Sequence, residues 1–132
     1  MIVQAVISSN AVDAENQIIP SEVLFPELQK WQENYGNVRG GYGALEKPVG
    51  KATGVSLDRN GLVYATIQVV DPETQEYIRK GVYTHAVLGL ANWAVVKDPD
   101  AKGGRFTRLN VLALHLTDGA SNPDNRFLTV TD

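Results

Sequence analysis

Histidine and hydroxyl side chains limit the chemistry that this chain could perform, because it has no Cys and only two histidines, His85 and His115. A serine-type hydrolase needs a histidine as general base beside a hydroxyl nucleophile. Both histidines lie in strand-like sequence, where we favour a hydrogen-bonded structural role. A zinc site would need Cys ligands, a short His-x-His spacing or an HExxH pattern, and the sequence has none of them. We therefore expect no bound metal and no cofactor.

A second candidate for a binding site is the glycine cluster at residues 36–43, which contains Gly36, Gly40, Gly41 and Gly43. Glycine-rich loops can cradle phosphate, but no GxxxxGK[ST] pattern follows and no glycine fingerprint joins a strand to a helix here. Such glycine density is typical of irregular backbone. We interpret residues 37–46 as a structural loop.

Alternating and helical hydropathy patterns predict the elements that must position these groups. Apolar residues at Leu24, Leu28, Trp31 and Tyr35 share one helical face, and we expect these aromatic side chains, with Trp93, to pack in the core. The predicted strands cover residues 2–9, 49–57, 62–70, 83–96, 105–117 and 127–130, and the predicted helices cover residues 26–35, after a short first turn at 21–25, and 72–80.

Turn chemistry supports several of these boundaries. Pro26 is expected to begin the main part of the first helix, because proline is poorly tolerated inside one. Asn60-Gly61 supplies the positive φ values of a tight hairpin turn, and Asp71-Pro72 resembles the start of a helix that Gly81 ends. A polar turn is expected at residues 97–104, and Leu112, Leu114 and Leu116 should share one face of the following strand.

Length and composition fit one α+β domain over residues 1–132, a mostly antiparallel sheet or small barrel of six to seven strands with two helices. The net charge is −3, so we expect no nucleic-acid partner. The longest apolar stretch, residues 86–96, is about half of what a membrane-spanning helix needs, and we expect no membrane association. The first ten residues do not resemble a signal peptide.

Three segments in order resemble the bacteriophage prohead protease family, the serine proteases of capsid maturation whose fold resembles herpesvirus assemblin. They are VDAENQIIPSEVL, then PVGKATGVSLDRNGLVYATIQVVDPETQEYIRKGVY, and finally LALHLTDGASNPDNRF, which is similar to the family pattern EISLVDRPANPDARF. The resemblance covers almost the whole chain and implies a prohead-protease-like fold.

The same resemblance implies that the catalytic positions are degenerate. The family's histidine, in the loop before the VGK-like strand, corresponds to Tyr42, and its nucleophilic serine corresponds to Val87. The acidic residue and the small serine of EISLV correspond to Ala113 and His115. Thr84 is the nearest hydroxyl to Val87, but a three-residue shift would reverse its strand face.

The resemblance and the degenerate positions together predict a pseudoprotease, a non-catalytic structural protein of a phage particle, most directly a capsid decoration or cement protein. An active maturation protease and a virion- or tail-associated adaptor are the alternatives. The expected partner is the major capsid protein or another virion protein, homo-oligomerisation is left open, and the expected location is the virion, with the host cytoplasm during assembly. A partner groove is expected near Gly40, Gly41, Tyr42, Gly43 and Val87.

Overall fold

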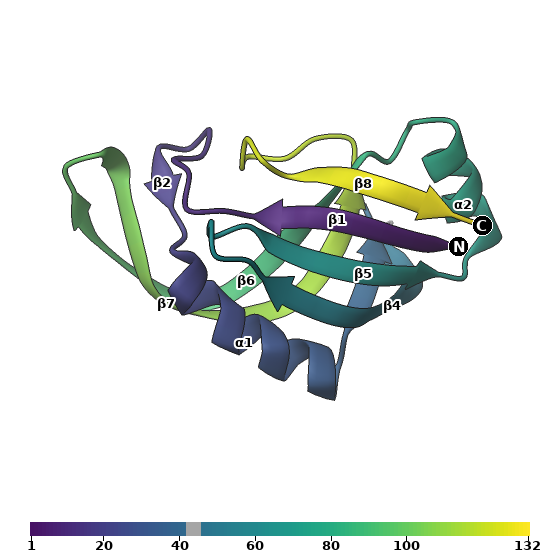
Figure 1. Ribbon diagram of the computed structural model, residues 1–132, viewed down its shortest axis with the longest axis horizontal. Helices are drawn as coiled ribbons and strands as arrows, with labels where there is room; N and C mark the ends of the chain where they lie inside the picture. The colour runs from purple at the N-terminus through teal and green to yellow at the C-terminus, as the bar shows by residue number, and fades with distance from the viewer. Residues whose placement is uncertain (42–45) are drawn as a thin grey trace.

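The computed structural model describes residues 1–41 and 46–132 (Figure 1). Two helices and eight strands follow one another within these described residues. Their bounds are β1 Ile2–Ser8, β2 Gln17–Ile18, α1 Ser21–Asn34, β3 Asn37–Gly40, β4 Lys47–Leu57, β5 Val63–Val69, α2 Pro72–Arg79, β6 His85–Asp98, β7 Ala101–Thr117 and β8 Arg126–Thr131.

The strands form one mixed sheet that curls into a half-barrel (Figure 1). Its order is β2-β7-β3-β4-β5-β1-β8, and β6 pairs with β7 outside this path. In the part of the chain that the structure describes, β2 and β3 pair with β7 in parallel, and the other pairings are antiparallel. The expected α+β class, with a mostly antiparallel sheet or small barrel and two helices, is therefore confirmed. The short strands β2 and β3 were not predicted.

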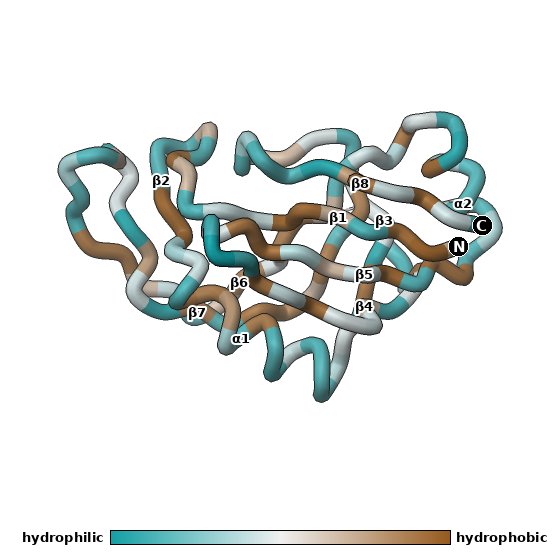
Figure 2. Tube along the Cα trace, viewed as in Figure 1, coloured by the Kyte–Doolittle hydropathy of each residue, from teal (hydrophilic) through white to brown (hydrophobic). Residues whose placement is uncertain are grey.

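A single cluster of buried side chains fills the concave side of the sheet, and brown apolar stretches follow its strands in Figure 2. Residues of β5 alternate between this core and more exposed positions, as period-two side chains require, whereas β1 alternates only at its start and its last four residues, 5–8, are all buried. Helix α1 adds Leu24, Leu28 and Trp31, and the Trp31 indole N–H donates to Asn37 Oδ1 at 2.8 Å. The helix therefore covers the sheet and is also joined to β3 by this hydrogen bond.

Three expectations about aromatic and proline residues need correction. Helix α1 begins at Ser21 and contains Pro26. Packing of the apolar face in the core outweighs the lost backbone hydrogen bond and the crowding of the preceding turn that proline causes there. Tyr35 lies beyond the last buried turn and is 67% exposed, and Trp93 is 54% exposed. Helix α1 ends at Asn34, and Gly36, with φ of 62°, follows as the predicted stop residue.

The glycine-rich stretch is not wholly irregular, because β3 pairs with β4 on one side and with β7 on the other. The β4–β5 hairpin is confirmed, although only Gly61 of its turn has a positive φ, at 83°. Asp58 Oδ1 accepts the backbone N–H groups of Asn60 and Leu62, which holds the turn without a left-handed Asn60.

Bulges decide which side chains of β6 and β7 are buried. The register shifts after Gly89, so Leu112 is an extra residue that is 58% exposed, whereas Leu114 and Leu116 are fully buried. The expected shared face therefore fails at Leu112. The turn between the strands is also shorter than expected, because Asp98 already pairs with Ala101.

Helix α2 begins as predicted, with Asp71 as its N-cap. The Asp71 carboxylate accepts the Thr74 hydroxyl at 2.6 Å and the Thr74 N–H at 3.0 Å, and Lys47 Nζ lies 3.2 Å away. The hydrogen bond from the Thr74 hydroxyl is the largest cause that holds the pKa of Asp71 below its usual value, and Lys47 acts in the same direction. This cap fixes α2 at the end of β5.

We predict that Asp71→Ala lowers the free energy of unfolding by about 1 kcal/mol, the usual cost of losing such a cap. Because the folded pKa is depressed, the contribution is full above the unfolded pKa and is lost as the pH falls through the folded value. Urea titrations at neutral and acidic pH measure the difference. Asp118→Ala, at an exposed turn position, is the control. Equal losses from both variants would contradict the capping role.

Candidate functional site

The positions that the resemblance equates with catalytic residues lie on neighbouring strands. Val87 of β6 is directly opposite His115 of β7, and Gly89 is opposite Ala113. Directly opposite residues project from the same face of a sheet. The structure thus brings Val87, Ala113 and His115 together, whereas Tyr42 lies outside the described residues.

His115 is held as a structural side chain at this face. Its Nδ1 lies 2.9 Å from the Gly41 carbonyl, an acceptor, so Nδ1 carries the proton and donates it. Glu46 Oε2 lies 3.4 Å from the same nitrogen, and Arg39 Nε lies 3.0 Å from Glu46 Oε1, at an angle outside hydrogen-bond geometry. His115 is 8% exposed, and a side chain at Gly89 would crowd its ring at 3.0 Å.

Two hydroxyls could be considered as nucleophiles. Thr84 Oγ1 lies 2.7 Å from Nδ1 of His85, its neighbour in the sequence. Ser9 is buried and donates to Asp124 Oδ2 at 2.6 Å. Neither arrangement has the order that a triad needs, a hydroxyl on a histidine that a carboxylate orients. His85 and His115 are both hydrogen-bonded strand residues, as predicted.

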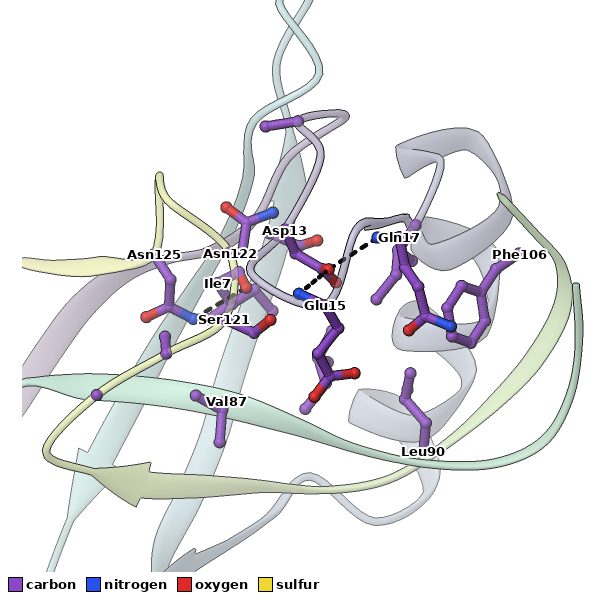
Figure 3. Close-up of a pocket in the computed structure, with 16 residues that line it drawn as sticks. Ile7, Asp13, Glu15, Gln17, Val87, Leu90, Phe106, Ser121, Asn122 and Asn125 are labelled. Atoms are coloured by element: carbon purple, nitrogen blue, oxygen red, sulfur yellow. Dashed lines mark hydrogen bonds between the residues drawn. The ribbon is translucent and has the colours of Figure 1, made fainter. Parts of the chain in front are cut away.

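A cavity of about 270 Å³ opens beside Val87 (Figure 3). Its floor is β6 and its walls are the loop before β2 and the loop before β8. Leu88, Leu90 and Phe106 line it together with Val87, and the Glu15 side chain extends from the opposite loop toward β6. The cavity combines an apolar floor with carboxylates on one rim.

The loop that carries these carboxylates is organised by Asp13. Asp13 Oδ1 accepts the backbone N–H groups of Glu15 and Gln17, both at 2.9 Å. One oxygen of Asp13 is therefore committed to shaping the loop. Glu15 is exposed at the rim, where its charge can meet a ligand.

Asn125 joins the two edges of the half-barrel at the wall of the cavity. Its side-chain N–H groups donate to the Ile7 carbonyl at 3.0 Å and to the Ala86 carbonyl at 2.6 Å. Ile7 belongs to β1 and Ala86 to β6, two strands that do not pair with each other. Asn125 is 5% exposed, and its Oδ1 has no hydrogen-bond partner among the described residues.

The described residues of the expected partner groove do not line one common cavity. Gly40 and Gly41 lie at the end of β3, on the far side of β7 from β6, and Gly41 N–H donates to the Leu116 carbonyl. Neither glycine lines the cavity that Val87 lines. Tyr42 and Gly43 fall outside the described residues. The Val87 cavity is therefore a separate candidate, with walls from residues 11–19 and 119–125 that the sequence did not indicate.

Within residues 1–41 and 46–132 no group of three or more His, Asp or Glu side chains could hold a metal ion. No helix in that part of the chain is long and apolar enough to cross a membrane. No family model matches the chain, and neither the curated proteins nor the solved structures include a match. The site is therefore interpreted from its own geometry.

We predict that Asn125→Asp lowers the free energy of unfolding by about 2–4 kcal/mol at neutral pH. A carboxylate of nearly the same shape cannot donate, so it would face two carbonyl oxygens in a buried position. The loss should shrink in acid, where a protonated carboxyl regains one donor. Denaturant titrations across pH measure it, with exposed Asn34→Asp as the matched control. A loss no larger than that of the control would show that the seam, the junction between β1 and β6, does not depend on Asn125.

Proposed function

We propose that this chain is a non-catalytic structural protein of a phage particle, a capsid decoration or cement protein built on a prohead-protease-like domain. The observation that carries the proposal is the pairing of Val87 with His115. At the place where the resemblance puts a nucleophile, the chain has an aliphatic side chain facing a histidine whose Nδ1 is bound to Gly41.

Two further features support a binding role over a catalytic one. Ala113, at the position of the family's acidic residue, has no group that could orient a base. The surface beside Val87 remains a cavity with apolar and carboxylate lining. A fold that keeps such a surface without a nucleophile is suited to holding a partner, since sites and folds are separable.

The partner in this proposal is the major capsid protein or another virion protein, and the location is the virion after assembly in the host cytoplasm. A tail-associated adaptor would use the same fold at a different place in the particle. An active protease could draw on the contact between Thr84 Oγ1 and His85 Nδ1, which lie 2.7 Å apart.

We predict that a serine-reactive fluorophosphonate probe leaves the purified protein unlabelled. Val87→Ser should also remain unlabelled, because a hydroxyl without an aligned base is a weak nucleophile. Val87 is only half-buried, so this variant should lose about 1 kcal/mol or less of unfolding free energy. Labelling of the wild type that disappears in Thr84→Val would establish the protease alternative.

We predict that the protein persists in purified mature particles at a fixed ratio to the shell protein. Quantitative mass spectrometry of immature and mature particles of the phage that encodes the chain measures this ratio. A cement protein has to remain bound to the lattice it stabilises. Loss of the chain on maturation would contradict the proposal, and retention only in isolated tails would favour the adaptor.

A further inference from the structure

The far end of the β6–β7 hairpin projects beyond the other strands, at the left of Figure 1. We call residues 91–108 the arm. Within the described residues β6 pairs only with β7, so the outer edge of β6 along the arm carries unpaired backbone groups. An unpaired edge of this length favours association with another surface.

The arm presents apolar and cationic side chains together. Trp93 is 54% exposed, and Val95 and Val96 are each 43% exposed. Four of the twelve basic residues and two of the fifteen acidic residues lie in the arm, which gives it a net charge of +2. Arg105 is paired with Asp98 at 3.3 Å, whereas Lys97 and Lys102 are exposed.

The rest of the chain has the opposite charge. It contains eight basic and thirteen acidic residues, a net charge of −5. The cavity beside β6 is the place where this acidic surface meets an apolar lining, with Asp13 and Glu15 on the loop at its rim and Leu90 of β6 below Glu15 (Figure 3). Arm and cavity are therefore complementary in both charge and hydropathy.

The arm is also braced in an extended position. Strand β2 pairs in parallel with Gly104 and Arg105, and Gly103 N–H donates to the Asn16 carbonyl at 2.7 Å. A side chain at Gly103 would lie 2.8 Å from the Glu15 carbonyl, so this close approach requires glycine. These contacts hold the return strand of the arm against residues 15–18, and the turn of the arm extends beyond the other strands (Figure 1).

We propose that the arm of one copy docks into the β6 cavity of a second copy, so that this protein self-associates head to tail. Trp93 would cover the apolar lining, and Lys97 and Lys102 would meet Glu15 and Asp13. Such an interface joins two different surfaces of one chain, and it therefore builds a ring or an open chain of copies. The inference goes beyond the proposed function and does not depend on a phage partner.

Sedimentation velocity over a series of protein concentrations tests this interface. The wild type should gain mass with concentration, and high salt should weaken the association, because exposed charges are screened. Lys97→Glu in the arm and Glu15→Lys at the cavity should each raise the dissociation constant about tenfold or more. Lys51→Glu, an equal charge change on exposed β4, should leave it unchanged. Circular dichroism checks that each variant is folded.

Mixing the two charge variants gives the decisive measurement. The acidic arm of Lys97→Glu matches the basic rim of Glu15→Lys, and the unchanged arm and rim that the two variants retain also match each other. An equimolar mixture should therefore associate more tightly than either variant alone. A wild type that stays monomeric at all concentrations would overturn the proposal. So would association that Glu15→Lys leaves intact, which would indicate edge-to-edge pairing of β6, or a mixture that associates no more tightly than either variant alone. These measurements use only the purified chain, so their failure leaves the particle experiments unaffected.

Discussion

The amide of Asn125 holds together a sheet that does not close on itself. Strands β1 and β6 reach the two sides of the seam without a common ladder, and the Asn125 side chain donates to the carbonyls of Ile7 and Ala86 across it. A single side chain satisfies both because its two N–H groups diverge. The backbone bond from Phe127 to Thr84, at 3.3 Å, reinforces the same junction. The cavity lies beyond this narrow junction, where the seam between β1 and β6 remains open.

The open seam also explains the character of β6. A strand inside a closed barrel would have both edges paired, but β6 has β7 on one side only. It can therefore continue past the core as an arm and can carry exposed residues such as Trp93. The same open edge leaves Val87 half-buried beside the cavity. One incomplete closure thus produces the cavity, the arm and the environment of Val87.

Local chemistry made much of this fold predictable from the sequence. The turn at Gly61 and the Asp71 cap each depend on residues within a few positions of one another, and both form at the expected places. Pairing between distant segments was not predictable in this way. A bulge that exposes Leu112 depends on register with β6, and β3 depends on partners on both sides. Helix α1 tolerates Pro26 because tertiary packing outweighs one lost hydrogen bond.

The candidate site was likewise predictable only in part, because some of its residues depend on contacts between distant segments. The sequence placed Val87 and His115 at related positions through a resemblance, and the pairing of β6 with β7 brings them face to face. The role of Asn125 was hidden, because its partners are backbone carbonyls 118 and 39 positions away, which carry no sequence signal. Yet Asn125 stands where the family pattern ANPDARF has alanine, and that substitution was the one local hint. Asn125 bonds the carbonyl next to Val87 in the chain, so the folded structure, and not the sequence, brings the seam and the candidate site together.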